Sequence, residues 1–150
     1  MMGANVGYDL WFVAHLMLAV AAVVVLGALR YSATLSLTDT DRGRVAKRFP
    51  NRVNWAARLI HLVPCTGLVL SGIGGHDVSL SRPWVLTGLV LYVVLAYVVE
   101  ARVLPVERQV AEIVRDPSQE FTSTVRRLVR VLDSALLIMT ITFAVMVSQF

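Results

Sequence analysis

In this 150-residue chain, the side chains that could take part in chemistry are two histidines and a group of ionisable residues. His15 and His61 each lie inside a long apolar run, and histidines on neighbouring apolar helices can hold haem b. Because ionisable groups in an apolar environment are costly, they usually pair. We therefore expect Asp133 to contact His61 or Arg58, within a boundary cluster that consists of Arg58, His61, Glu100, Arg102, Arg130 and Asp133.

The expected depths of the two histidines conflict with a shared haem. His15 lies about 8 Å from the outer end of its apolar run, and His61 lies a similar distance from the inner end of its own. Across a hydrocarbon core of about 30 Å, the imidazoles would then be about 15 Å apart along the membrane normal. We expect packing histidines that are hydrogen-bonded, and no cofactor. The alternative is a redox module that binds haem b, copper or quinone through His15 or His61.

Other chemical signals in the sequence are weak. Cys65 is the single cysteine and follows His61 by four residues, but two ligands are too few for a closed zinc site, so we expect no metal. No nucleophile–base pair, glycine-rich phosphate loop or paired catalytic carboxylates stand out, which indicates a protein that is not an enzyme. For the boundary cluster we favour a structural role at the membrane interface over proton transfer or headgroup binding.

Four apolar runs must position these residues. Hydrophobic residues make up 57% of the chain, charged residues only 16%, and the mean hydropathy is +0.69. A soluble domain usually has about 25% charged residues. A helix of about 20 residues spans the hydrocarbon core, so the sequence predicts an all-α bundle of four transmembrane helices in a single domain, 1–150. The predicted spans are residues 10–29, 56–75, 84–99 and 132–147.

The distribution of basic residues predicts the orientation of this bundle. Of the 14 Lys and Arg residues, only Arg82 lies outside the segments 30–58 and 102–130. The positive-inside rule then places both basic segments in the cytoplasm and both termini outside the cell. Because the basic residues follow this topology, the net charge of +4 does not indicate a nucleic-acid-binding domain.

Both basic segments are predicted to be partly amphipathic helix. Residues 38–49 begin with helix-capping side chains, and residues 106–114 have apolar side chains at helical spacing. We expect the second of these helices to lie along the inner membrane surface. The basic residues favour anionic phospholipid of the cytoplasmic leaflet as a partner.

A stripe of small residues in the second run indicates close helix packing. Gly67, Ser71 and Gly75 recur at every fourth position, which lets another helix approach closely. The neighbour is either the first run or a helix of another subunit.

Three segments resemble a known family. They are WFVAHLMLAV, RFPNRVNWAARLIHLVPCTGLVLSGIG and RPWVLTGLVLYVVLAYVVEARVLPVERQVAEI. They are similar to small bacterial integral membrane proteins known as domain of unknown function 2269, a family distantly similar to copper-resistance D-type modules. Those modules often have Trp-x-Gly-Gly after the histidine of the first helix, whereas this chain has LAVAAVVVLG. The resemblance implies a four-helix bundle in the bacterial cytoplasmic membrane and no established activity.

The sequence therefore leads to two functional hypotheses. The first is an accessory, non-catalytic membrane subunit that stabilises or regulates a larger bacterial complex, such as a respiratory or lipid-transport assembly. Its partners would be other integral membrane subunits and anionic phospholipid, and not nucleic acid. The second is the small redox module described above.

Overall fold

The computed structural model describes residues 6–50, 52–74, 80–114 and 121–148, and every regular element in these ranges is helical. This confirms the predicted all-α class. The elements are the α-helices α1 (Val6–Ser36), α2 (Arg42–Arg48), α3 (Leu62–Ile73), α4 (Pro83–Val98), α5 (Leu104–Ile113) and α6 (Phe121–Val147), the 3₁₀ helix η1 (Ala57–His61) and the π-helix η3 (Val99–Val103).

Within the described ranges, three helices are long and apolar enough to cross a membrane, and they indicate a membrane protein. The longest two have 31 residues each, or about 46 Å, which exceeds a hydrocarbon core of about 30 Å. The second predicted span, residues 56–75, corresponds to the shorter apolar helix Ala57–Ile73. The three membrane-length helices are Val6–Ser36, Pro83–Ile113 and Phe121–Val147.

Pro64 explains why the second run does not form one long α-helix. It is the third residue of α3, and in a first helical turn its missing N–H group leaves no hydrogen bond unmade. The chain ahead of it winds more tightly as η1. Instead of a continuous helix over residues 56–75, the structure has a 3₁₀ helix of 5 residues followed by an α-helix of 12.

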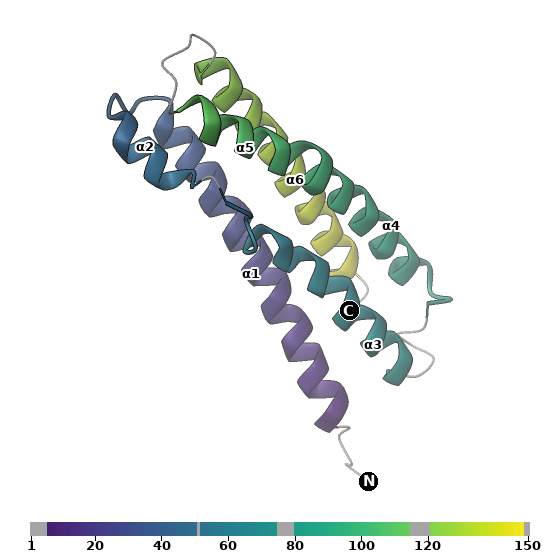
Figure 1. Cartoon of the computed structure of the whole chain (residues 1–150). Helices are drawn as coiled ribbons and strands as arrows, with labels where there is room; N and C mark the ends of the chain where they lie inside the picture. Colours follow the sequence, from purple (N-terminus) through teal and green to yellow (C-terminus); the bar gives the residue numbers. More distant parts are fainter. Residues whose placement is uncertain (1–5, 51, 75–79, 115–120, 149–150) are drawn as a thin grey trace.

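The long helices pack around α6. Figure 1 shows α6 beside α1 on one side and beside the line formed by α4 and α5 on the other, while η1 and α3 pack against α1. Buried positions recur at spacings of three and four residues on both α1 and α6. Such spacing is typical of helices that cross at about 20°. The buried residues of this interface are Ala22, Leu26, Leu29 and Ala33 on α1, and Val125, Leu128, Leu132 and Ala135 on α6.

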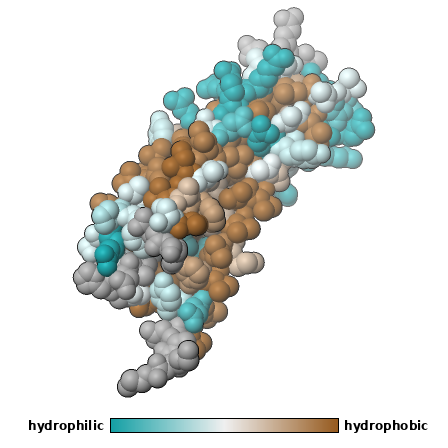
Figure 2. Space-filling model, turned by 180° about the vertical axis from the view of Figure 1, so that it is seen from behind, coloured by the Kyte–Doolittle hydropathy of each residue, from teal (hydrophilic) through white to brown (hydrophobic). Residues whose placement is uncertain are grey.

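Apolar side chains cover much of the outside of the bundle. Figure 2 shows a broad hydrophobic band over the middle of one face, with hydrophilic residues gathered at the end that holds α2 and the start of α6. Met17 and Val24 on α1, Tyr97 on α4 and Leu137 on α6 are exposed examples. Contiguous apolar surface of this extent is unusual for a monomer in water and is what lipid would cover.

A π turn joins α4 to α5. Pro105 has no N–H group to donate, and its ring would clash with the carbonyl four residues earlier in a regular α-helix. The backbone N–H of Leu104 instead bonds to the carbonyl of Val99, five residues back. The predicted helix after Pro105 is present, but it does not turn away along a membrane surface. It continues the line of α4 beside α6 and buries Val106 and Val110 (Figure 1).

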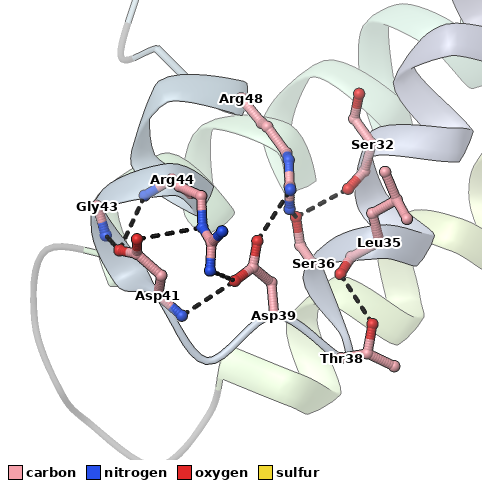
Figure 3. A network of polar contacts seen from close by, with 9 residues as sticks. All are labelled: Ser32, Leu35, Ser36, Thr38, Asp39, Asp41, Gly43, Arg44 and Arg48. Carbon is pink, nitrogen blue, oxygen red and sulfur yellow. Dashed lines mark hydrogen bonds and ion pairs between the residues drawn. The ribbon is translucent and has the colours of Figure 1, made fainter.

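The connection after α1 folds back as the short helix α2 (Figure 3). The Oδ1 atom of Asp41 accepts hydrogen bonds from the backbone N–H groups of Gly43 at 2.9 Å and Arg44 at 3.2 Å. This is an N-cap, which supplies acceptors to amides that have no partner within the helix. The capping side chains predicted within residues 38–49 are thereby confirmed.

Asp39 ties α2 to the end of α1. Its carboxylate accepts hydrogen bonds from the backbone N–H of Asp41 at 3.0 Å and from Nη2 of Arg48 at 2.9 Å. Arg48 also donates to Oγ of Ser36, 3.3 Å away, at the last residue of α1 (Figure 3). The bond from Asp41, supported by the charges of Arg44 and Arg48, lowers the pKa of Asp39 below its ordinary value.

Acidification is expected to loosen α2 through Asp39. A carboxyl group whose pKa is lowered in the folded state stabilises that state above its unfolded pKa, and this contribution is lost as the pH falls through the folded pKa. Amide hydrogen exchange within α2 should therefore accelerate, beyond its intrinsic pH dependence, below about pH 4. Asp39→Asn should exchange faster at neutral pH and lose this acid-dependent step. The same acid-dependent step in the variant would contradict the assignment to Asp39.

Candidate functional site

Four polar side chains meet between η1, α4 and η3, and we call them the His61 cluster: Arg58, His61, Tyr92 and Glu100. Nε2 of His61 lies 3.0 Å from Oε1 of Glu100, and Nδ1 lies 2.8 Å from the hydroxyl of Tyr92. Nε of Arg58 lies 3.3 Å from the same Oε1 atom, and its Nη2 donates to Oε2 at 3.4 Å. Glu100 therefore contacts the side chains of both Arg58 and His61 of η1.

Local backbone geometry brings these residues together. In a 3₁₀ helix, residues three apart eclipse one another, so Arg58 and His61 leave η1 on the same side. Glu100 is in the π turn η3, whose origin in Pro105 is described above. Trp55, just ahead of η1, has its ring 5.4 Å from the guanidinium carbon of Arg58.

The contacts form a chain of hydrogen bonds. A neutral imidazole has one donor and one acceptor nitrogen, and one assignment satisfies every member. The Tyr92 hydroxyl donates to Nδ1 of His61, and Nε2–H of His61 donates to Glu100. Such a chain can carry a proton between phenol and carboxylate. The buried Nε of Arg58 is near Glu100 but makes no hydrogen bond within the described ranges.

A second polar contact continues along the same face. Nδ2 of Asn54 donates to both carboxylate oxygens of Glu107 on α5, at 2.9 and 3.1 Å. Its Oδ1 accepts from the backbone N–H of Ala57 at the start of η1. Asn54 thus links the chain before η1 to α5, a role that the sequence analysis did not anticipate.

The structure brings together only part of the boundary cluster. Arg58, His61 and Glu100 are in contact, whereas Asp133 forms an ion pair with Arg30 of α1. The expected contact of Asp133 with His61 or Arg58 is therefore wrong. The reason is the packing order, because α6 meets α1 and α4, while η1 meets α1 and α3.

Two other members of the boundary cluster lie apart from His61. Arg102 is exposed on η3 and Arg130 is exposed on α6, and neither forms an ion pair with a described residue. Tyr92 and Arg30, which do make polar contacts, were missed. Tyr92 belongs to the apolar run 84–99, which gives no sign of a polar contact. Arg30 follows the first apolar run, which ends at Leu29, although α1 continues to Ser36.

His15 packs between α1 and α3. Its Nδ1 atom lies 3.0 Å from the carbonyl oxygen of Val63 and 2.9 Å from Oγ1 of Thr66. A Cβ atom on Gly67 would lie 3.3 Å from Cε1 of this ring, so the glycine makes room for the imidazole. These contacts fit the predicted packing histidine.

The predicted depth difference between the two histidines is wrong. Because the His15 ring lies between Val63 and Gly67, His61 is only about one helical turn, roughly 5 Å, further along the bundle. It is level with the middle of the apolar run of α1, since η1 packs against α1 at that height (Figure 1). Depth is therefore no argument against a shared ligand. In the structure, both ring nitrogens of His61 and Nδ1 of His15 are hydrogen-bonded within the protein.

The structure answers in part which helix packs against the stripe of small residues. Gly67 faces His15, so the neighbour at this position is α1. Ser71 is partly buried, and Gly75 lies outside the described residues. A further close approach was not predicted: a Cβ atom on Gly88 of α4 would overlap Cε of Met146 on α6.

A larger residue at Gly67 should weaken the contact between α1 and α3. Gly67→Val is expected to lower the free energy of unfolding by about 1–2 kcal/mol, because the new side chain must displace the His15 ring. Gly72→Val is the matched control in the same helix, since nothing lies within 4 Å of a Cβ atom there. It should change stability by less than about 0.5 kcal/mol in detergent unfolding. Equal effects of both variants would contradict this role of Gly67.

The described part of the chain is thus a helical protein with three helices long and apolar enough to cross a membrane, in which several ionisable side chains pair between helices. Compared with protein-family models, curated proteins and solved structures, the chain has no match. The resemblance to the family known as domain of unknown function 2269 stays a prediction.

Proposed function

We propose that the chain is an accessory, non-catalytic subunit of a larger complex in a bacterial cytoplasmic membrane. In this proposal the basic end faces the cytoplasm, both termini lie outside, and the short helix formed by η1 and α3 completes a four-helix bundle. The partners are other integral membrane subunits. The role is to stabilise or regulate their assembly through helix packing.

The observation that carries this proposal is the incomplete burial of the His61 cluster. The side chains of Arg58, His61 and Glu100 remain 30%, 35% and 39% exposed, although His61 lies level with the apolar run of α1. Ionisable groups at such a depth in a membrane normally face a protein interior or a water-filled cavity. A helix from another subunit, placed over η1, would provide that interior. Trp55, which is 71% exposed beside Arg58, offers it a large apolar contact.

Extraction of the tagged chain from its native membrane in mild detergent tests the proposal. Mass spectrometry should find other membrane subunits in stoichiometric amounts. Trp55→Ala should reduce their recovery, whereas Trp11→Ala, which changes an exposed tryptophan on α1, should not. Recovery of the chain alone from several mild detergents would overturn the proposal.

The second candidate is a redox module, and the chain of hydrogen bonds from Tyr92 through His61 to Glu100 favours it. Such a chain could exchange a proton with a quinone headgroup, and displacement of Tyr92 would free Nδ1 of His61 for a metal or haem. A visible spectrum of the same extract separates the two candidates. A Soret band that is lost in His61→Ala would identify a haem protein. Quinone in the solvent extract of the wild type, absent from that variant, would identify a quinone site.

A further inference from the structure

A groove of about 610 Å³ runs between α5 and the start of α6. A second groove, of about 430 Å³, adjoins it on the other side of Arg130 and is lined by Leu37, Arg126, Val129 and Arg130. Arg130 therefore borders both. The residues that line the first groove are Gln109, Ile113, Ser123, Thr124, Arg127 and Arg130.

The grooves carry positive charge that no described carboxylate neutralises. Arg126, Arg127 and Arg130 are exposed, and none forms an ion pair within residues 6–50, 52–74, 80–114 or 121–148. Other arginines are paired, as Arg48 is with Asp39 and Arg58 with Glu100. An arginine fork matches the oxygens of a phosphate group, and it can bond to them in a bidentate manner.

The position of Arg130 along α6 matches the boundary between headgroups and acyl chains. The helix continues from this residue to Val147, which is about 25 Å of mostly apolar surface, close to a hydrocarbon core of about 30 Å. Leu137 and Ile141 follow Arg130 by close to two and three helical turns, so all three share one side of α6. Both are exposed, by 61% and 45%. A cationic groove thus continues into an exposed apolar strip.

We propose that this surface binds one anionic phospholipid. Its phosphate lies between Arg127 and Arg130, and an acyl chain follows Leu137 and Ile141. The side chains of Gln109 and Thr124 offer hydrogen bonds to the hydroxyl groups of a headgroup such as glycerol. This site is independent of the subunit proposal, because it lies on α5 and α6 and uses no residue of the His61 cluster.

The site can be tested by titrating the purified chain with phosphatidylglycerol in micelles of a neutral detergent. Native mass spectrometry counts the bound lipid. Arg127→Gln/Arg130→Gln should raise the apparent Kd about 30-fold, since each arginine near a phosphate surface contributes to binding. The matched control is Arg102→Gln/Arg108→Gln, which removes the same charge from exposed positions outside both grooves and should leave the Kd unchanged.

Several outcomes would overturn the proposal. If the control variant loses as much affinity as Arg127→Gln/Arg130→Gln, the attraction is diffuse. If the wild type binds phosphatidylcholine as tightly as phosphatidylglycerol, the anionic headgroup is not needed. Displacement of the lipid by excess inorganic phosphate would also overturn it, since the groove would then be a site for a free anion. Each single substitution, Arg127→Gln or Arg130→Gln, should weaken binding about fivefold, which keeps the test decisive if the double variant does not fold.

Discussion

Replacing Glu100 with alanine is expected to lower the free energy of unfolding by about 2 kcal/mol. Removal of this carboxylate leaves the guanidinium of Arg58 and the Nε2 atom of His61 without their acceptor. Loss of one partner of a fully buried ion pair costs about 3–5 kcal/mol, and the partial exposure of these side chains reduces that figure. Thermal or denaturant unfolding in detergent micelles measures the change.

Glu112→Ala is the matched control for this experiment. Glu112 is an exposed carboxylate on α5, and it forms no ion pair with a described residue. Its loss should change stability by less than about 0.5 kcal/mol. A double-mutant cycle between Glu100→Ala and Arg58→Gln should give a coupling energy of about 1 kcal/mol. Zero coupling, together with equal effects of the two glutamate variants, would show that the His61 cluster does not stabilise the bundle.

Leu132→Ala should lower the free energy of unfolding by about 2–3 kcal/mol. Leu132 is fully buried on α6, in the interface with α1. Lipid surrounds the helices in the unfolded reference state of a membrane protein, so little of this loss comes from transfer out of water. Most of it comes from the contacts that the neighbouring side chains lose when a cavity opens beside them.

The control on the same helix is Leu137→Ala. Leu137 is 61% exposed, so lipid can fill the space that the shorter side chain leaves. Its free energy of unfolding should stay within about 0.5 kcal/mol of the wild type. If Leu137→Ala destabilises the protein as much as Leu132→Ala, the residues of α6 that face the core are assigned incorrectly.

Much of the fold could be predicted from the length of the apolar runs. A run such as residues 10–29 is long enough to cross a membrane as a helix, and α1 contains it entirely. The true helix ends were harder to predict, because hydropathy marks where lipid contact ends and not where helical hydrogen bonding ends. Arg30 illustrates the difference, since it follows the apolar run and is still within α1, where it reaches Asp133.

The candidate site was less predictable than the fold. The sequence analysis places Arg58, His61 and Glu100 near the same membrane boundary, and the structure brings these three residues into contact. Which helices are neighbours cannot be read from hydropathy, so Asp133 was assigned to the wrong partner. The height of η1 against α1 was also missed, because it follows from the packing of His15 against Gly67 and not from either run alone.

The π turn at Val99–Val103 has a consequence for how the long helix from Pro83 to Ile113 can change. A π turn contains about one residue more than an α turn, so the faces of α5 are out of phase with those of α4 by about 100°. The two halves of this helix therefore pack against α6 with different faces. The first half uses Gly88, and the second half uses Val106 and Val110. Loss of a single residue within the turn would rotate one half relative to the other by about 100° and would press the ring of Pro105 against the carbonyl four residues earlier.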